Sequence, residues 1–246
     1  MKTVSILAAS AFLASGAAAA TAYGERKLIV GGEAVPTNSK LYTVGIREDP
    51  FDPNFCAGAL ISLTHVLTSP NCVNGTSPSL WVSVGSNYII GVDGEMNKVV
   101  SAKTHPKFDN DYVSYAFAVL ELELPVNKVK PVQLADADDP HVEVGTVVTS
   151  VGLGFTSVSS DGSVQSELQR MDVRLWGEEE CSSRSEATLC GSAGEGKGVC
   201  LGDSGNPLIV ESETGKDSDD VLLGVLVGSE FAAETLEMAK AATMST

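Results

Sequence analysis

The stretch CLGDSGNPLIV, Cys200–Val210, decides the fold when it is taken together with two segments that precede it in the chain. These are IVGG at Ile29–Gly32 and CAGALISLTHVLTSPNC at Cys56–Cys72. Alone, IVGG is a weak signal and a Gly-x-Ser string is common, so neither would identify a fold. Present together, in this order and at these separations, the three segments are highly specific.

Short β-rich runs dominate the chain between these segments, with Gly, Pro, Asn and Ser between the runs. We expect strands at Leu41–Ile46, His65–Thr68, Leu80–Val84, Tyr88–Val92, Tyr115–Leu122, Thr146–Val151, Met171–Leu175 and Val221–Val227. This spacing predicts an all-β antiparallel sandwich or barrel rather than an alternation of strands and helices. No strong amphipathic helix is predicted before Glu234–Ala241.

The acidic stretch PVQLADADDPHVEVG, residues 131–145, has a proline at its start and no clear periodicity. Such a segment is the best candidate for a linker between two halves of similar size. The sequence shows no internal repeat. We therefore expect two units joined at residues 131–145.

Residues 1–22 have the pattern of a signal peptide: Lys2, an apolar stretch from Val4 to about Leu13, and then small residues. The alternative is a membrane anchor. The apolar stretch is too short to span a bilayer comfortably, since a spanning helix needs about 20 residues. The sequence therefore predicts a secreted protein without a membrane association.

Acidic residues outnumber basic ones by 32 to 16, which gives a net charge of −16 over 246 residues. A phosphate backbone binds to a basic face, so this balance argues against a nucleic-acid partner. The composition, 43% hydrophobic and 20% charged, is typical of a folded protein. Any charged partner is expected to be basic.

The five cysteines are disulfide candidates, because a secreted chain folds in an oxidising compartment. They are Cys56, Cys72, Cys181, Cys190 and Cys200. No histidine stands at zinc spacing among them, so we expect no metal site and no cofactor. An odd count leaves at least one thiol without an intramolecular partner. Asn74-Gly75-Thr76 is an N-glycosylation acceptor, which fits secretion.

From Ile29 to about Gly228 the chain resembles the trypsin-like (S1) serine proteases. Pro131–Leu134, at the connection between the halves, and Ser150–Gly154 support the resemblance. It implies two antiparallel six-stranded β-barrels, at residues 29–130 and 146–228, with a cleft between them. Residues 23–28 would be a short pro-segment. Residues 229–246 would be a divergent tail that forms a poor helix or stays disordered.

The resemblance puts a catalytic nucleophile at Ser204 and an oxyanion hole at the amides of Gly202 and Ser204. It puts the general base at Asn71 and the orienting carboxylate at Ala116. A carboxamide does not take a proton near neutral pH, and a methyl group cannot orient a base. With two of the three catalytic groups replaced, the sequence predicts an inactive protease homologue.

Other family positions also differ. The base of the specificity pocket would be Gly198, which carries no charge to attract a Lys or Arg substrate. Asp203 stands where the family pairs a carboxylate with a newly cleaved N-terminal amine. Leu28 would leave that N-terminus one residue too long after cleavage at the basic pair, so the pairing is not expected. Asn206 replaces a glycine, and its side chain is expected to disturb the local backbone.

No sequence pattern directs a histidine toward Ser204. His65 lies in a short strand, His105 begins a loop and His141 lies in the linker. We expect all three to be partly exposed surface or loop residues.

The resemblance also implies the cysteine pairing. Cys56–Cys72 and Cys181–Cys190 match family disulfides. Cys200 lacks its usual partner, because no cysteine follows it, and is the expected free thiol.

Within the family, the segments GALISLTHVLTSPNC, SYAFAVLELELPV and GDSGNPLIV are most similar to the glucanase inhibitor proteins of oomycete plant pathogens. The resemblance implies a protein secreted into the host apoplast, where it binds and inhibits plant endo-β-1,3-glucanases and so suppresses plant defence. It leaves the oligomeric state open. Two alternatives remain: a serine endopeptidase with residual activity through Ser204, and a degenerate copy without a stable fold.

Overall fold

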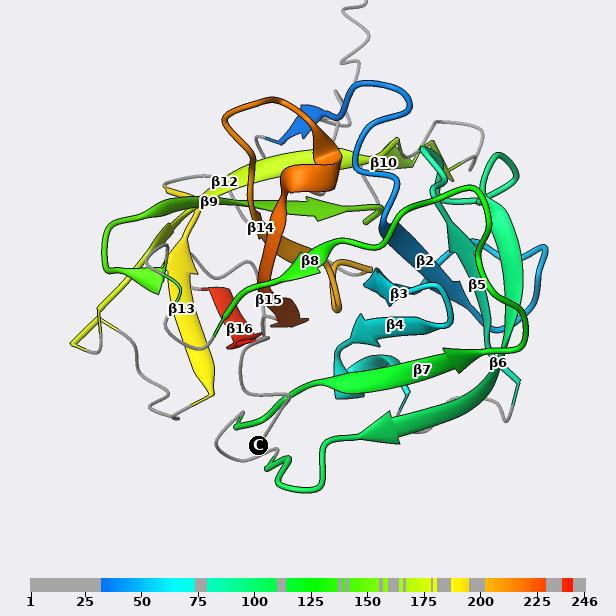
Figure 1. Ribbon diagram of the computed structural model, residues 1–246, viewed down its shortest axis with the longest axis horizontal. Helices are drawn as coiled ribbons and strands as arrows, with labels where there is room; N and C mark the ends of the chain where they lie inside the picture. The colour runs from blue at the N-terminus through cyan, green and yellow to red at the C-terminus, as the bar shows by residue number, and fades with distance from the viewer. Residues whose placement is uncertain are drawn as a thin grey trace, which may run out of the picture.

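The computed structural model describes residues 32–73, 79–109, 114–136, 139, 142–154, 157–158, 164–165, 167–177, 179–180, 187–194, 202–228 and 236–240. The regular elements among these residues are β-strands and short 3₁₀ turns. Figure 1 shows them as two groups of strands packed side by side, with the first half of the chain on the right and the second half on the left. The all-β prediction is therefore confirmed.

The first group is a closed barrel, in which the strand order is β2-β3-β4-β7-β6-β5. Its strands are β2 (Thr43–Arg47), β3 (Cys56–Ser62), β4 (His65–Thr68), β5 (Trp81–Val84), β6 (Glu95–Thr104) and β7 (Ala118–Leu122). All neighbours pair antiparallel. Side chains alternate along β7, where Ala118, Leu120 and Leu122 are buried and Glu121 is exposed. This alternation fills the barrel with apolar groups and leaves polar ones in water.

The second group also closes into a ring of six strands. They are β9 (Val147–Gly152), β12 (Gln169–Leu175), β13 (Thr188–Ser192), β14 (Pro207–Val210), β15 (Val221–Gly228) and β16 (Leu236–Lys240). The pairings run from β9 to β12, β13, β16, β15, β14 and back to β9. The prediction of two six-stranded antiparallel barrels is confirmed.

Four short strands lie outside these rings. β1 (Glu33–Ala34) pairs with β12, and β8 (Gln133–Leu134) pairs parallel to β15. β10 (Ser157–Val158) and β11 (Val164–Gln165) form a hairpin. The expected linker thus contributes a strand to the edge of the second barrel.

The helix expected at Glu234–Ala241 is wrong, because Leu236–Lys240 is strand β16. Its backbone pairs with β13 on one side and β15 on the other. The residue types Leu, Glu, Met, Ala and Lys favour a helix, but intrinsic preference is a weak prior. Closing the ring satisfies the backbone groups of two strand edges at once, and that gain decides the conformation.

The strand expected at Tyr88–Val92 is also wrong. This stretch forms a turn between β5 and β6, in which Tyr88 makes an isolated bridge to Glu167 and Gly91 has a φ of +66°. A left-handed residue interrupts the extended backbone of a strand, so the apolar content of the stretch does not decide its conformation.

A single hydrophobic cluster runs through the junction between the barrels. It joins Leu60 and Leu120 of the first barrel to Val151, Ile209 and Leu222 of the second. All five side chains are at most 1% exposed. Burial of such a continuous apolar surface holds the two barrels together.

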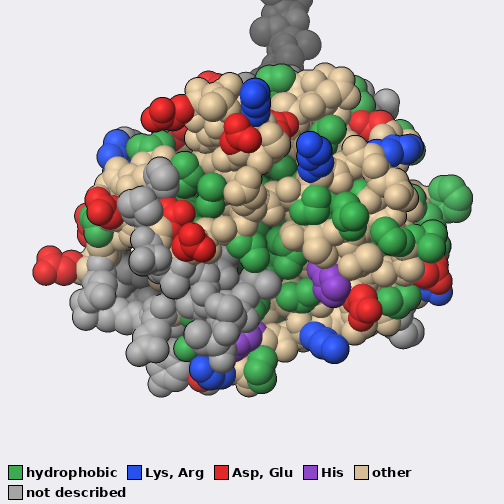
Figure 2. Space-filling model, in the orientation of Figure 1, with side chains coloured by type: hydrophobic (Ala, Val, Ile, Leu, Met, Phe, Trp, Pro, Cys, Tyr) green, Lys and Arg blue, Asp and Glu red, His purple; other side chains and the backbone are tan. Residues whose placement is uncertain are grey.

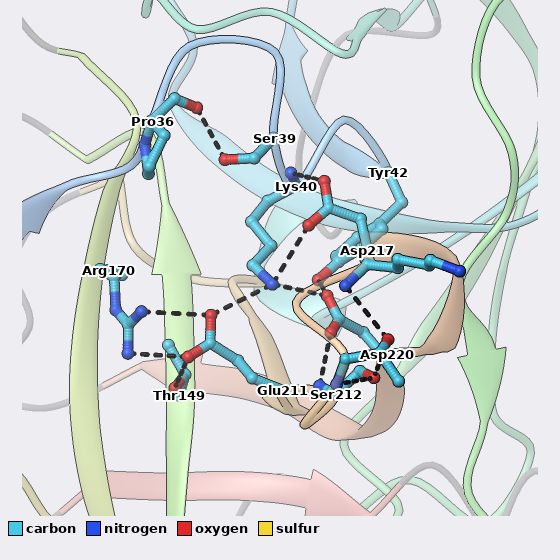
Figure 3. A network of polar contacts seen from close by, with 12 residues as sticks. Pro36, Ser39, Lys40, Tyr42, Thr149, Arg170, Glu211, Ser212, Asp217 and Asp220 are labelled. Atoms are coloured by element: carbon cyan, nitrogen blue, oxygen red, sulfur yellow. Dashed lines mark hydrogen bonds and ion pairs between the residues drawn. The ribbon is translucent and has the colours of Figure 1, made fainter.

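A network of charged side chains also joins the two halves, and Figure 3 shows it. Lys40, just before β2, extends to three carboxylates on the second half of the chain: Nζ lies 2.7 Å from Asp220 Oδ2, 3.1 Å from Glu211 Oε1 and 3.3 Å from Asp217 Oδ1. The Tyr42 hydroxyl donates to Asp220 Oδ2 at 2.7 Å. The Lys40 and Asp220 side chains are only 11% and 1% exposed, so water screens this contact little.

Burial alone would lower the pKa of Lys40, but hydrogen bonds to Asp220 and Glu211 outweigh burial and raise it. Burial, together with the Asp220 carboxylate, also raises the pKa of Tyr42. Both pKa values are higher in the folded state than in the unfolded state. The stabilisation is therefore complete below about pH 10 and is lost as the pH rises through the folded-state pKa values.

We expect Lys40→Met to lower the free energy of unfolding by about 3 kcal/mol at pH 7, because it leaves buried carboxylates without their cation. The difference in the free energy of unfolding between this variant and the wild type should shrink above about pH 11, because Lys40 of the wild type loses its charge there. Urea unfolding at both pH values measures this. Lys103→Met, at an exposed position in β6, is the control and should change stability by less than about 0.5 kcal/mol. Equal loss in the two variants would contradict a stabilising role of the network.

Candidate functional site

Asn71, expected at the position of the catalytic base, lies in the 3₁₀ turn η1 (Pro70–Cys72) at the end of β4. The turn starts at Ser69, whose Oγ accepts a hydrogen bond from Asn71 N at 3.3 Å. A disulfide joins Cys72 to Cys56 of β3, with a Cα–Cα distance of 5.8 Å. This confirms the predicted pair and fixes the turn against the first barrel.

The Asn71 side chain contacts the second barrel. Its Nδ2 donates to the backbone carbonyl of Val227 in β15 at 2.9 Å, and Ser69 Oγ donates to the same carbonyl at 3.2 Å. The amide nitrogen is a donor only, so this arrangement has no acceptor for a serine proton on that atom. Asn71 therefore joins the barrels by a hydrogen bond.

Ser204 belongs to the second barrel and contacts the first barrel through its backbone. Its carbonyl accepts a hydrogen bond of 2.8 Å from Ala57 N in β3, and the next residue, Gly205, donates to Leu226 O at 2.7 Å. Gly205 has a φ of +85°, and a Cβ there would overlap the Ala57 carbonyl and Thr68 Oγ1. Only glycine fits here, between β3 and β15, which explains why a glycine follows Ser204.

Ala116, expected at the position of the orienting carboxylate, is fully buried in the hydrophobic cluster at the junction. It lies two residues before Ala118, which pairs with Thr68 at the end of β4. The methyl group of Ala116 therefore lies near the end of β4. The preceding residue, Tyr115, has a φ of +51°, a conformation that a bulky side chain rarely adopts.

His65 is held by hydroxyl groups beside it. Its Nδ1 lies 3.0 Å from Ser62 Oγ and 3.0 Å from Thr64 Oγ1, at the start of β4. Ser204 lies across from Ala57 and Thr68, at the other end of this strand. His65 is thus a surface residue of the first barrel, as predicted.

His105 stacks on Tyr115 with ring centroids 4.9 Å apart and contacts Phe117 at 4.7 Å. Burial, assisted by the charge of Lys107, lowers its pKa. Its Nδ1 accepts a hydrogen bond from Lys107 N at 3.3 Å. Within the residues that the structure describes, neither this imidazole nor that of His65 hydrogen-bonds to the Ser204 hydroxyl.

Asn206, whose side chain we expected to disturb the local backbone, is buried in the turn, and no described group donates to its Oδ1. Its side chain is 1% exposed, and its Nδ2 donates to Asp203 Oδ1 at 3.0 Å. Its backbone N–H donates to Asp203 O at 3.0 Å, and its carbonyl accepts from Leu226 N at 2.9 Å. The side chain fills the space beside Gly152, where a Cβ would overlap it. Asn206 therefore supports the turn that holds Ser204.

Gly202 and Ser204, whose amides we expected to form an oxyanion hole, are part of this turn, and Gly202 has a φ of +91°. Cys190 takes part in a disulfide. The remaining predicted positions lie outside the described residues: 1–31, Asn74, His141, Cys181, Gly198 and Cys200.

The described part of the chain contains no cluster of three or more His, Cys, Asp or Glu residues arranged to hold a metal ion. It also contains no helix of the length and hydrophobicity needed to cross a membrane.

Sequence patterns did not indicate two of the groups that build this junction. Val227 acts through its backbone carbonyl, which any residue carries, so its type gives no signal. The Ser69 hydroxyl is one of many in the chain, and only its position before a proline at Pro70 is typical of the start of a helical turn.

Comparison with known proteins agrees with this geometry. Residues 29–244 match the family model for trypsin. The chain belongs to the trypsin family. Two similar relatives are glucanase inhibitor protein 3 of Phytophthora sojae and glucanase inhibitor protein 4 of Phytophthora infestans. The first is 42% identical over 92% of this chain and 88% of the relative. The second is 41% identical over 92% of this chain and 89% of the relative.

A trypsin of Saccharopolyspora erythraea is 32% identical over 75% of this chain and 83% of its own length. This trypsin-family chain is thus more similar to proteins named as inhibitors than to that enzyme.

We expect Gly205→Ala to destabilise this trypsin-family fold by at least about 3 kcal/mol, because a Cβ would overlap the β3 backbone in addition to the unfavourable φ. Gly215→Ala is the matched control. Gly215 also has a positive φ, +68°, but no atom lies within 4 Å of its Cβ position. It should lose only about 1 kcal/mol. Thermal unfolding of both variants measures the difference, and equal losses would contradict the close approach at Gly205.

Proposed function

We propose that this protein is a secreted, catalytically inactive member of the trypsin family that binds and inhibits plant endo-β-1,3-glucanases. The observation that carries the inactivity is the contact of Asn71. At the position expected for the base, the side-chain amide of Asn71 donates a hydrogen bond to Val227 O at 2.9 Å. A protease needs an imidazole there to accept the serine proton.

The chemistry at Ser204 lacks two contributions. Asn71 supplies no base to remove its proton, and Ala116 supplies no carboxylate to orient such a base. Loss of such a base reduces turnover by about 10⁴ to 10⁶. The fold around the serine is nevertheless kept, since Gly205 and Asn206 hold the turn in place. A stable scaffold without catalysis is suited to binding, because fold and function are separable.

The inhibitory function is supported by the two relatives named glucanase inhibitor proteins, each above 40% identity over most of the chain. The net charge of −16 favours encounter with a basic enzyme. The signal-peptide pattern of residues 1–22 and the sequon at Asn74 support secretion. In the host apoplast the protein would protect the cell wall of a pathogen and suppress plant defence.

The purified mature chain should inhibit laminarin hydrolysis by a plant endo-β-1,3-glucanase at near-stoichiometric concentration. Ser204→Ala should inhibit equally well, with a Kd within twofold of the wild type, because inhibition does not use the serine hydroxyl. Release of reducing sugar from laminarin measures activity, and intact-mass spectrometry of the glucanase checks that it is not cleaved.

Trypsin that is produced in the same expression host and blocked covalently at its catalytic serine is the control and should not inhibit. Failure of the wild type to inhibit any of a panel of plant endo-β-1,3-glucanases would contradict the proposed function. Inhibition that is lost in Ser204→Ala and is accompanied by cleaved glucanase would instead favour a residual serine endopeptidase, the alternative that the intact Gly-Asp-Ser-Gly turn supports.

A further inference from the structure

Two loops of the first barrel lie side by side, joined by a buried arginine. The loop at residues 48–55 connects β2 to β3, and the loop at residues 85–94 connects β5 to β6. Arg47 is 0% exposed, and its Nη1 donates to Asp52 O in the first loop at 3.1 Å and to Ile90 O in the second at 2.6 Å. One nitrogen atom thus holds the two loop backbones together.

Further contacts fix the shape of both loops. Asn54 N donates to Ile89 O at 3.1 Å, and Ser83 Oγ donates to Gly91 O at 2.8 Å. Gly91 has a φ of +66°, and a Cβ there would overlap the guanidinium of Arg47. Because the backbone is held from inside, the loop tips are preorganised and would lose little entropy on binding.

The tips of these loops expose large apolar side chains. Phe51 is 90% exposed, Val92 is 79% exposed and Ile90 is 48% exposed. Figure 2 shows hydrophobic side chains projecting from the right edge of the molecule, where Figure 1 has the loop that follows β2. Single exposed apolar residues are common, but several on adjoining preorganised loops mark an interaction surface. We call Phe51, Ile90 and Val92 the loop-tip surface.

The charges beside this surface indicate the kind of partner. Glu48, Asp49 and Asp52 are exposed on the same loop as Phe51. Arg47, which precedes this loop, is buried, and its two terminal nitrogens donate to the loop backbones and to Asn54 Oδ1. A second copy of this chain would bring like charges together, at a net charge of −16 per chain. A basic protein with an apolar depression fits both features.

We infer that the loop-tip surface is the docking site for a basic plant endo-β-1,3-glucanase, with the Phe51 ring as the anchor. This inference rests on the proposed function and deepens it. Aromatic side chains with neighbouring apolar groups carry most of the binding free energy in protein interfaces.

The test is the double variant Phe51→Ser/Val92→Ser in the full mature chain. Both side chains are largely exposed, so the fold should be kept and the thermal unfolding midpoint unchanged. We expect its Kd for a purified basic plant endo-β-1,3-glucanase, measured by surface plasmon resonance, to rise about 30-fold. Val144→Ser/Val147→Ser is the matched control at 69% and 50% exposed positions of the second half, and should stay within twofold.

A charge variant tests the acidic rim separately. Glu48→Lys should slow association about threefold or more at low salt, with little change in dissociation, and the difference should disappear at high salt. Glu123→Lys, at an exposed position after β7, is its control and should change association less. Equal slowing in the two variants would overturn the local charge argument.

The outcomes separate this inference from the proposed function. If the wild type inhibits glucanase and Phe51→Ser/Val92→Ser binds equally well, the proposed function stands and the docking site is overturned. If the wild type binds no glucanase, the proposed function itself fails, and this inference with it. If sedimentation shows a wild-type dimer that the double variant converts to a monomer, the surface pairs two copies of the chain and the inference is overturned.

Discussion

The structure depends on a small set of hydrogen bonds between the two barrels, each accepted by a backbone carbonyl. Ala57 N donates to Ser204 O at 2.8 Å, and Asn71 Nδ2 donates to Val227 O at 2.9 Å from the neighbouring turn. These contacts require close approach of the chains, which Gly205 permits because it has no Cβ. The same approach places the serine between the barrels. Its position thus follows from packing and does not require that it react.

The residues expected at the catalytic positions contribute to the fold through contacts that involve no catalysis. At the two positions where the family resemblance leads us to expect a base and a carboxylate, Asn71 donates a hydrogen bond and the methyl group of Ala116 packs in the apolar cluster. The junction gains further support from Lys40, which reaches carboxylates of the second half of the chain. These contacts stabilise the two-barrel arrangement without a catalytic step, which is consistent with our proposal that the scaffold binds a protein partner.

Local strand patterns predicted an antiparallel sandwich or barrel, and the resemblance of three segments to the trypsin-like proteases implied two barrels and the Cys56–Cys72 disulfide. It did not predict β16, since pairing with two distant strands overrides a local preference for helix. It also did not indicate the Lys40 network or the contact of Asn71 with Val227. Their partners lie more than a hundred residues away in the chain, and a single lysine or a backbone carbonyl has no local signature. The turn at Asn206 shows the same limit, because its side chain is accommodated by the space beside Gly152.

The most direct test of the central claim is the reaction of Ser204 with a fluorophosphonate probe, followed by intact-mass spectrometry of the folded protein. We predict no adduct on Ser204 under conditions that label trypsin completely, since Asn71 offers a carboxamide where a protease has an imidazole to accept the serine proton. Stoichiometric labelling of Ser204 at a rate similar to that of trypsin would contradict it, and the molecule would then have to be regarded as an active hydrolase.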